Sequence, residues 1–299
     1  MNYRLLGNSG LSVSELTLGT VELGVNYGFR GSEHYEKPDR SAGMEVIRHA
    51  LRRGINLLDT ASAYGDAEAL IGETGVSCYI ATKVTLPANP AQIAASIDNS
   101  LRLLKRDRLD VLQLHNPTLE TIGDPQLIDS LQHALDSGKV GIVGASLYGE
   151  ELALAALANP IFRTLQVPFN MLDQGMTERV FPLAQRNGVA VLVRSVFLRG
   201  VLTARIHSIP ERLSPLRERV LSVLADEPSE RLATLAIRFC LSFPAITSLI
   251  LGIRTIEELD ANLDAAAEGP LDAQTLERLR PLSMSDDPMV SPLNWQDLI

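Results

Sequence analysis

One unit recurs along this chain: a short apolar run, a polar or glycine-bearing loop, and then an amphipathic helical stretch. Several of the apolar runs are rich in Val, Ile and Leu without polar alternation, which is typical of parallel strands buried on both faces. The expected strands are Glu15–Thr20, Ile55–Asp59, Cys78–Lys83, Leu109–His115, Val140–Ser146, Thr164–Val167, Val189–Arg194 and Ile246–Leu251. Eight strands that alternate with helices predict a closed (β/α)8 TIM barrel of the α/β class rather than an open sheet.

The helical stretches between these strands carry apolar residues on one face. They are Ser41–Arg53, Pro90–Leu104, Asp124–Ser137, Glu150–Ala158, Thr177–Asn187, Glu230–Leu241 and Glu257–Ala267, with one further short helix after Asp66. We expect a small N-terminal hairpin that closes the bottom of the barrel, an extra helix within 198–228, and an irregular C-terminal tail. No break in composition divides the 299 residues, so we expect a single domain over 1–299.

Charge and composition exclude several classes of protein. The formal net charge of −9 argues against nucleic acid and against an anionic membrane surface as partners. No apolar stretch approaches the length of a transmembrane helix, and the first residues lack the pattern of a signal peptide. The two cysteines, Cys78 and Cys240, lie in apolar runs and read as buried thiols. We therefore expect a cytoplasmic protein; the pattern predicts no particular oligomeric state.

The common nucleotide-binding and metal-binding patterns are absent from the sequence. No strand is followed by GxGxxG, no GxxxxGK[ST] loop occurs, and the five histidines are scattered without metal-ligand spacing. A Rossmann fold and a metal site are therefore not expected.

In barrels of this kind the reactive groups come from the C-terminal ends of the strands and the loops that follow. Asp59 ends the second expected strand and Tyr64 follows it, Lys83 ends the third, and His115 ends the fourth. Charged residues are unusual at buried sheet positions and need partners there. We place Asp59 and Lys83 at equivalent heights on neighbouring strands, where they can pair. All four side chains are expected to meet at one mouth of the barrel.

The segments around these residues resemble the successive signature segments of the aldo-keto reductases. They are GNSGLSVSELTLGT, HALRRGINLLDTASAYG, ATKV, LDVLQLHNP, GKVGIVGAS and LILGIRTIEELDANL, and they cover nearly the whole chain in order. The resemblance implies a (β/α)8 barrel, an extended nicotinamide cofactor bound without a Rossmann domain, and reversible conversion between a carbonyl and an alcohol. We expect no metal.

The four residues also suggest a mechanism. Reduction of a carbonyl needs hydride at carbon, which the nicotinamide supplies, and a proton at oxygen. We expect Tyr64 to act as the general acid/base, with the Lys83 ammonium lowering its pKa. Asp59 would hold Lys83 charged and aimed. His115 would orient the carbonyl oxygen, and proton donation by His115 is the lesser alternative.

The resemblance also implies a set of cofactor-binding residues. They are Gly19, Thr20, Asp59, Ser146, Gln166, Arg194, Ser195, Phe197, Arg199, Gly252, Arg254 and Asn262. Ser146 and Gln166 would bind the nicotinamide carboxamide, and the loop after the seventh strand would cup the pyrophosphate. Leu147 stands where the family often has Asn.

Two arginines in this set carry open alternatives. Arg194 stands where many relatives have an aromatic residue that stacks on the nicotinamide; it either stacks there or pairs with a phosphate or carboxylate. Arg254 offers a fork for a 2′-phosphate, which favours NADP(H) over NAD(H). Glu258 stands where some relatives have an adenosine-phosphate arginine, and Ala261 replaces a common Glu. Thr255 also reads as a helix N-cap with Glu258 at the third helical position.

The expected substrate is a small carbonyl or alcohol compound, with a sugar-like one favoured slightly over a steroid. The residues expected to contact it mix aromatic faces with hydrogen-bonding groups: Tyr27, Tyr64, His115, Asn116, Tyr148 and Trp295. Two alternatives stay open: a regulatory or scaffold barrel that binds the cofactor with little turnover, and a carbonyl isomerase or eliminase without net redox change. The intact quartet argues against the regulatory role, since binding alone does not require Tyr64.

Overall fold

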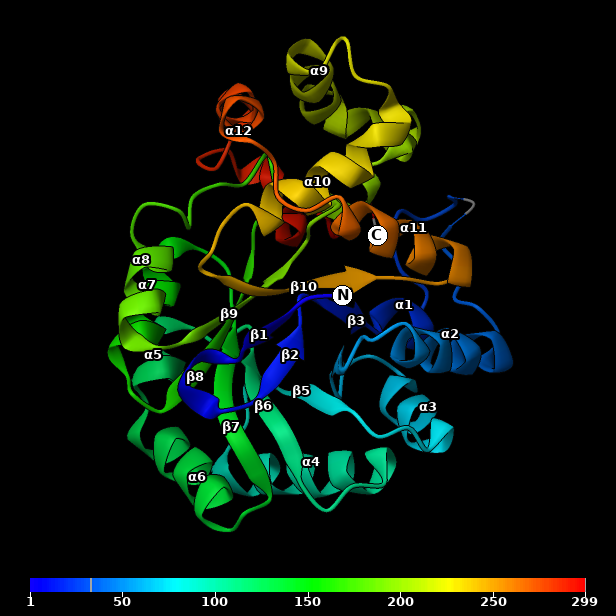
Figure 1. The fold of residues 1–299 in the computed structure, drawn as a ribbon. Helices are drawn as coiled ribbons and strands as arrows, with labels where there is room; N and C mark the ends of the chain where they lie inside the picture. Colours follow the sequence, from blue (N-terminus) through cyan, green and yellow to red (C-terminus); the bar gives the residue numbers. More distant parts are fainter. Residues whose placement is uncertain (33, 299) are drawn as a thin grey trace.

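The computed structural model describes residues 1–32 and 34–298 and contains a closed barrel of eight parallel strands (Figure 1). The strands are β3 (Leu16–Gly19), β4 (Leu57–Asp59), β5 (Tyr79–Thr85), β6 (Leu109–His115), β7 (Val140–Ser146), β8 (Phe162–Pro168), β9 (Ala190–Arg194) and β10 (Ile246–Gly252). They follow one another around the barrel in chain order, and β10 closes it by pairing with β3. The prediction of a (β/α)8 barrel is therefore confirmed.

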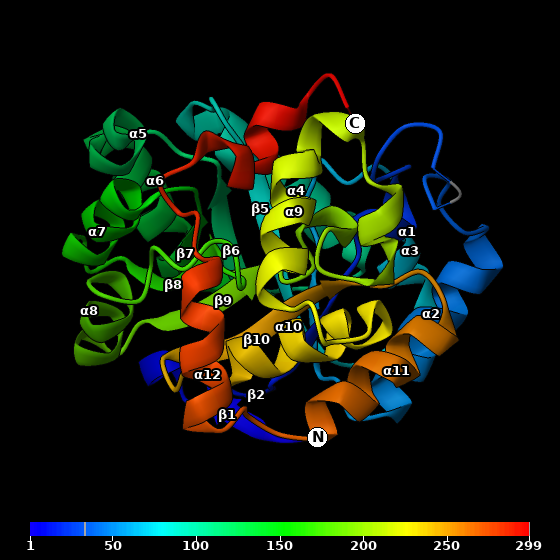
Figure 2. The same ribbon diagram turned by 90° about the horizontal axis from the view of Figure 1, so that it is seen from above.

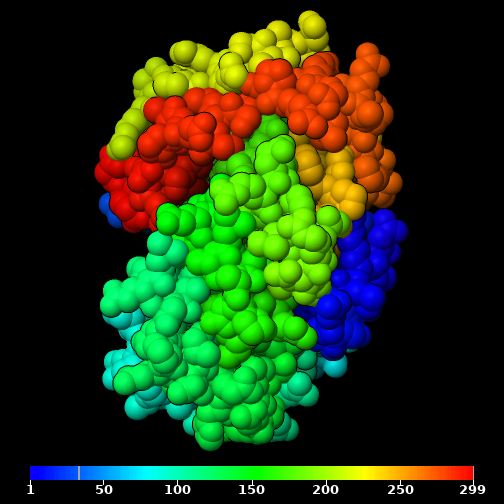
Figure 3. All heavy atoms as spheres, turned by 90° about the vertical axis from the view of Figure 1, so that its left-hand side faces the viewer, coloured from blue at the N-terminus to red at the C-terminus, as the bar shows by residue number. Residues whose placement is uncertain are grey.

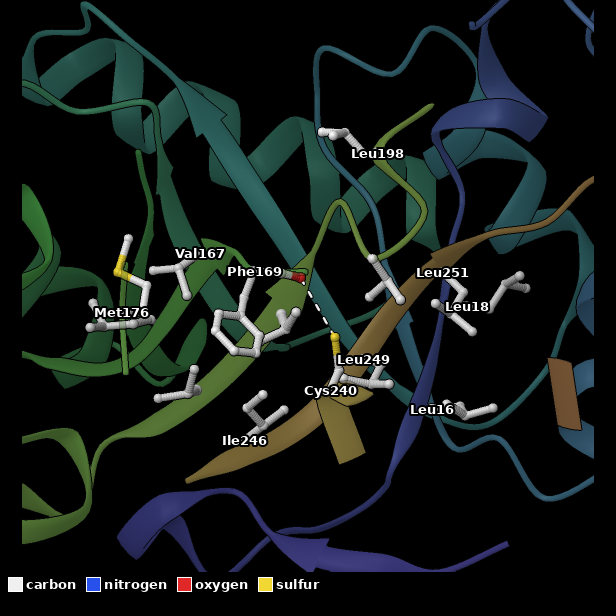
Figure 4. Close-up of a cluster of buried hydrophobic side chains, with 14 of the residues drawn as sticks. Leu16, Leu18, Val167, Phe169, Met176, Leu198, Cys240, Ile246, Leu249 and Leu251 are labelled. Carbon is white, nitrogen blue, oxygen red and sulfur yellow. Dashed lines mark hydrogen bonds between the residues drawn. The ribbon is translucent and has the colours of Figure 1, made fainter. Parts of the chain in front are cut away.

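Helices cover the outside of the barrel. They are α1 (Val21–Gly24), α2 (Arg40–Arg52), α3 (Ala67–Thr74), α4 (Pro90–Leu104), α5 (Leu119–Gly123), α6 (Pro125–Asp136), α7 (Glu150–Ala158), α8 (Val180–Asn187), α9 (Ser214–Val223), α10 (Leu232–Leu241), α11 (Ile256–Ala267) and α12 (Ala273–Leu279). Figure 4 shows part of the core, where the Cys240 thiol of α10 donates to the Phe169 carbonyl after β8 at 3.6 Å. Cys240 is fully buried, as its apolar context predicted.

The hairpin predicted at the N-terminus is present and lies across the N-terminal ends of the strands. Strands β1 (Tyr3–Leu5) and β2 (Ser12–Ser14) pair antiparallel, and Ser14 N–H donates to the Asn56 side chain just before β4. Leu6 and Val13 pack onto apolar side chains inside the barrel, including Leu57 and Val111. Figure 2 shows the hairpin and the C-terminal segment at opposite ends of the barrel.

The side chains that point into the barrel change character along its axis. Because side chains alternate along a strand, Leu57 and Asp59 share one face of β4, and Val111 and Gln113 share one face of β6. Near the hairpin this face is apolar, whereas at the C-terminal ends it carries Asp59, Gln113 and Gln166, joined by hydrogen bonds. The interior of the barrel is thus filled with apolar side chains at one end and carries polar groups at the other.

The extra helix predicted between the last two strands is α9, and it packs against the C-terminal segment. Arg212 just before α9 donates to Asp297 at 2.6 Å, and Figure 3 shows the red C-terminal segment beside the yellow-green segment that contains α9. Among residues 1–32 and 34–298, no helix is long and apolar enough to cross a lipid bilayer.

Candidate active site

A cavity of about 640 Å³ opens at the C-terminal ends of the strands. Most of the residues that the sequence pointed to line it: Gly19, Tyr27, Asp59, Tyr64, His115, Asn116, Ser146, Tyr148, Gln166, Arg194, Ser195, Phe197, Arg199 and Gly252. The structure therefore gathers residues from widely separated segments at one mouth of the barrel, where barrel enzymes carry their active sites.

Asp59 and Lys83 form a buried ion pair at the floor of this cavity. Lys83 Nζ donates to Asp59 Oδ1 at 2.7 Å, to Asp59 Oδ2 at 2.8 Å and to the Thr60 carbonyl at 2.9 Å. The Lys83 side chain is fully buried and that of Asp59 is 4% exposed. The backbone register pairs Asp59 with Ala81, so Lys83 starts two residues higher than predicted and its long side chain reaches back.

Tyr64 lies directly above this pair. Lys83 Nζ is 4.9 Å from the centre of the Tyr64 ring, and the rings of Tyr64 and His115 meet edge to face with centroids 5.9 Å apart. Tyr64, Asp59 and His115 line the cavity, and Lys83 supports them from below. The four side chains therefore lie together at one mouth of the barrel, as expected.

Burial sets the protonation of Tyr64 and His115. It raises the pKa of the Tyr64 phenol well above its usual value of 10, and the Asp59 carboxylate raises it further. Burial, together with the charges of Lys83 and Arg194, lowers the pKa of His115 to about 4. At neutral pH both groups are uncharged, and His115 offers a neutral imidazole.

The predicted lowering of the Tyr64 pKa by Lys83 is wrong for this geometry. Burial raises the pKa of Tyr64, and the Asp59 carboxylate, which holds Lys83 at hydrogen-bond distance, raises it further. Burial also lowers the pKa of Lys83, an effect that Asp59 opposes. The largest effect on the Tyr64 pKa is therefore burial, which makes the charged phenolate unfavourable.

A hydrogen-bonded chain of side chains continues from the ion pair across the barrel. Gln166 Nε2 donates to Asp59 Oδ1 at 2.7 Å and to Gln113 Oε1 at 3.0 Å, and Ser146 Oγ donates to Gln166 Oε1 at 3.1 Å. Gln113 was missed in the sequence. It lies two residues before His115 on β6, and this period-two spacing is the signal that could have found it.

The rim of the cavity carries arginines that stack on tyrosines. The Arg194 guanidinium lies 3.8 Å from the Tyr148 ring centre and donates to the Leu147 carbonyl at 3.1 Å. Arg199 stacks on Tyr27 at 4.0 Å. These residues bring positive charge to the mouth of a protein whose net charge is −9.

The loop that follows β9 holds an unusual backbone conformation. Ser195, Leu198 and Arg199 have φ of 61°, 44° and 53°, in the left-handed region that non-glycine residues seldom adopt. Arg199 Nε is buried and has no hydrogen-bond partner among residues 1–32 and 34–298. Strained residues of this kind gather at ligand-binding sites, and an unpartnered buried donor beside a cavity suits an anionic ligand.

Arg254 lies outside the cavity lining and is already engaged. Its Nε is 3.3 Å from Glu22 Oε2, its Nη2 is 3.4 Å from Glu258 Oε1, and its Nη1 donates to the His34 carbonyl. Glu22, which lines the cavity, was also missed, because its partner lies more than two hundred residues away in the chain. The fork expected to hold a 2′-phosphate is thus held by carboxylates.

Three other predicted residues lie behind the cavity wall rather than on it. Trp295 was expected to contact substrate, but it is 1% exposed and its indole N–H donates to the Met289 carbonyl. The C-terminal tail does reach the cavity, through Pro292, Leu293 and Gln296. Thr20 is fully buried and donates to the Asp59 carbonyl, and Asn262 is buried in α11.

Gly24 controls how closely the Tyr64 loop can approach the barrel. A Cβ on Gly24 would lie 2.0 Å from the Tyr64 carbonyl oxygen and 2.7 Å from Ala67 Cβ. Any larger residue would push that loop away, so a glycine in α1 fixes the position of the phenol.

Comparison with known proteins gives a consistent result. The Aldo/keto reductase family profile matches residues 15–283. Aldo-keto reductase YhdN of Bacillus subtilis is 29% identical over 69% of this chain, and the match spans 65% of that protein's length. The uncharacterized oxidoreductase YrpG of B. subtilis is 27% identical over 93% of this chain and 95% of its own.

Solved structures agree with the sequence relatives. The aldo-keto reductase AKR11C1 from Bacillus halodurans, in its holo form, superposes with a TM-score of 0.81 at 26% identity, covering 95% of this chain and 97% of the other.

Proposed function

The chain belongs to the aldo/keto reductase family, and on that premise we propose that it is an NADP(H)-dependent oxidoreductase that interconverts a small carbonyl compound and an alcohol. The observation that carries the proposal is the stack of Tyr64 over the buried Asp59–Lys83 pair, beside His115, on a cavity floor. A protein that only bound a nucleotide would have no need of a desolvated phenol beside a neutral imidazole.

Several residues of the cavity could bind a nicotinamide nucleotide. The Ser146 and Gln166 side chains bond to each other, and their oxygens keep lone pairs that can accept the N–H groups of a carboxamide. The buried Arg199 Nε, which has no partner among the described residues, offers a donor for a pyrophosphate. Gly252 lines the same cavity. These features fit such a cofactor, which when bound supplies or accepts the hydride.

In this proposal Tyr64 delivers a proton to the oxygen of the reacting carbonyl. Its raised pKa keeps the phenol protonated until negative charge develops on that oxygen, which is when a general acid is needed. His115, neutral at physiological pH, orients the same oxygen by a hydrogen bond. Asp59 and Lys83 are positioning residues that hold the floor beneath the phenol.

The substrate is proposed to be a small polar carbonyl compound. Around Tyr64 the cavity presents Asn116, Tyr148 and Arg194, which combine hydrogen-bonding groups with aromatic faces. Such a lining favours a hydroxylated or otherwise polar compound over a purely apolar one, because an apolar substrate would leave these groups unpaired.

A stoichiometric assay separates this function from its alternatives. A panel of aldehydes, ketones and keto-sugars is incubated with NADPH, and both nucleotide oxidation and alcohol formation are followed. We expect sustained turnover with one alcohol formed per nucleotide oxidised. Nucleotide binding without turnover across the panel would instead indicate a regulatory barrel, and product formed without net oxidation would indicate an isomerase or eliminase.

The pH dependence of reduction distinguishes the two candidate proton donors. Tyr64 stays protonated across the neutral range, so kcat/KM should be nearly flat between about pH 5 and 8. If His115 were the donor, its pKa of about 4 would leave roughly one molecule in a thousand protonated at pH 7. The value of kcat/KM would then rise about tenfold for each unit by which the pH falls. That slope in stopped-flow measurements would assign the proton to His115.

A further inference from the structure

The start of α11 contains an anion site that is filled by a side chain of the protein itself. Glu258 Oε2 accepts the backbone N–H of Arg254 at 2.9 Å. Its Oε1 lies 3.2 Å from Arg205 Nη2 and 3.4 Å from Arg254 Nη2. A backbone N–H at a helix N-terminus together with two guanidinium groups is the donor set that binds phosphate in proteins.

Helix capping alone does not explain this arrangement. Thr255 already caps α11, with its side chain accepting the Glu258 N–H at 3.2 Å. In a capping box the Glu258 carboxylate would accept a hydrogen bond from the Thr255 backbone N–H. Here it accepts one from the backbone N–H of the preceding residue, Arg254. There it also meets Arg205, which comes from the segment after β9 on the rim of the cavity.

Two carboxyl groups already face the two arginines of this cluster before any ligand arrives. Arg254 and Arg205 face Glu258 and Glu22, and Arg254 is only 7% exposed. Arg254 Nε is buried and makes no hydrogen bond of good geometry with any described residue, although it lies 3.3 Å from Glu22 Oε2. A phosphate group carrying close to two negative charges can bind these arginines only if Glu258 withdraws.

We propose that Glu258 is a specificity-determining residue that occupies the place of the cofactor's 2′-phosphate and so narrows the difference in affinity between NADPH and NADH. This inference rests on the proposed function, because it concerns the nucleotide that serves the reaction. NADH, which has a hydroxyl at that position, leaves the carboxylate where it is. NADPH must displace it and lose the three contacts that Glu258 makes.

The test is nucleotide binding to Glu258→Gln, measured by fluorescence titration without any substrate. The amide keeps the size of the side chain and removes its charge. We expect wild-type affinities for NADPH and NADH within about tenfold of each other. In the variant NADPH should bind about tenfold more tightly or better, the size of a charge-assisted hydrogen bond, and NADH should change less than about twofold.

A matched control is Glu257→Gln. Glu257 is the exposed neighbour in the same first turn and has no arginine partner among the described residues. It should leave both affinities unchanged, which excludes a general effect of removing charge near the helix N-terminus.

A second probe isolates the phosphate from the rest of the nucleotide. Adenosine 2′,5′-bisphosphate should bind Glu258→Gln more tightly than it binds the wild type, whereas adenosine 5′-diphosphate should not. Thermal unfolding of the variant shows whether the fold is kept. If the variant is destabilised, binding of the two adenosine phosphates is measured at low temperature.

The outcomes separate the two proposals. Equal changes in NADPH and NADH affinity, no gain for adenosine 2′,5′-bisphosphate, or an equal gain for adenosine 5′-diphosphate would overturn the role of Glu258 while leaving the reductase proposal standing. Failure of the wild type and of the variant to bind either dinucleotide would overturn both.

Discussion

Replacing Tyr64 with Phe is expected to lower kcat/KM for carbonyl reduction by about 10²–10⁴-fold, the usual contribution of a positioned general acid. The ring packs edge to face against His115 and above Lys83, and Phe preserves both contacts. Only the hydroxyl is lost. The dissociation constant for the nucleotide should therefore remain close to that of the wild type, as measured by fluorescence titration.

The control for this variant is Tyr79→Phe. Tyr79 begins β5 and packs with the apolar side chains near the N-terminal hairpin, at the end of the barrel away from the cavity. Loss of its hydroxyl should leave kcat/KM unchanged. Turnover of Tyr64→Phe at the wild-type rate would remove Tyr64 from the chemistry.

Replacing Lys83 with Met is expected to have the largest effect on stability. Asp59 would then be a buried carboxylate without its cation, and breaking a buried ion pair in this way costs about 3–5 kcal/mol in free energy of unfolding. The loss should appear as a lower midpoint in urea denaturation. Activity should fall as well, since Asp59 and Gln166 share one hydrogen-bonded chain with the floor beneath Tyr64.

Two comparisons make this result specific. Lys139→Met breaks an ion pair with Asp98 whose side chains are half exposed, and such pairs contribute little, so its midpoint should stay near the wild-type value. The double variant Lys83→Met with Asp59→Asn should be less destabilised than the sum of the two single variants. Additive losses would mean that the pair does not act as a unit.

The sequence predicted the barrel well because the required information is local. Hydrophobic runs such as Leu109–His115 and amphipathic stretches such as Pro90–Leu104 have the same limits in the structure. Both reflect periods that can be read within one element. The N-cap at Thr255 was also readable, because a cap bonds to a residue only three positions away.

The errors arise where contacts depend on parts of the chain that are distant in sequence. Lys83 pairs with Asp59 across a two-residue offset because the register of neighbouring strands is fixed by the whole barrel. Trp295 turned inward because the C-terminal tail folds back on itself and buries the indole. The pKa of Tyr64 rises because burial outweighs a cation that is already paired.

Arg254 shows how the sequence can single out a position while the contacts of its side chain are missed. Its position after the last strand pointed to a phosphate, and Glu258 was visible four residues later. Glu22, which pairs with Arg254, comes from the other end of the chain, and Arg205, which pairs with Glu258, comes from the segment after β9. No local sequence pattern predicts either contact.

In the proposed reaction, hydride passes from a nicotinamide nucleotide to a carbonyl carbon in the cavity lined by Asp59, Tyr64 and His115, with Lys83 beneath them. The most direct measurement uses reduced nucleotide carrying deuterium at both C4 positions of the nicotinamide, with mass spectrometry of the alcohol formed from an active carbonyl substrate. We predict alcohol that is heavier by about 1 Da in the wild type and almost no alcohol in Tyr64→Phe. Alcohol that forms without the label would mean that its hydride does not come from the nucleotide.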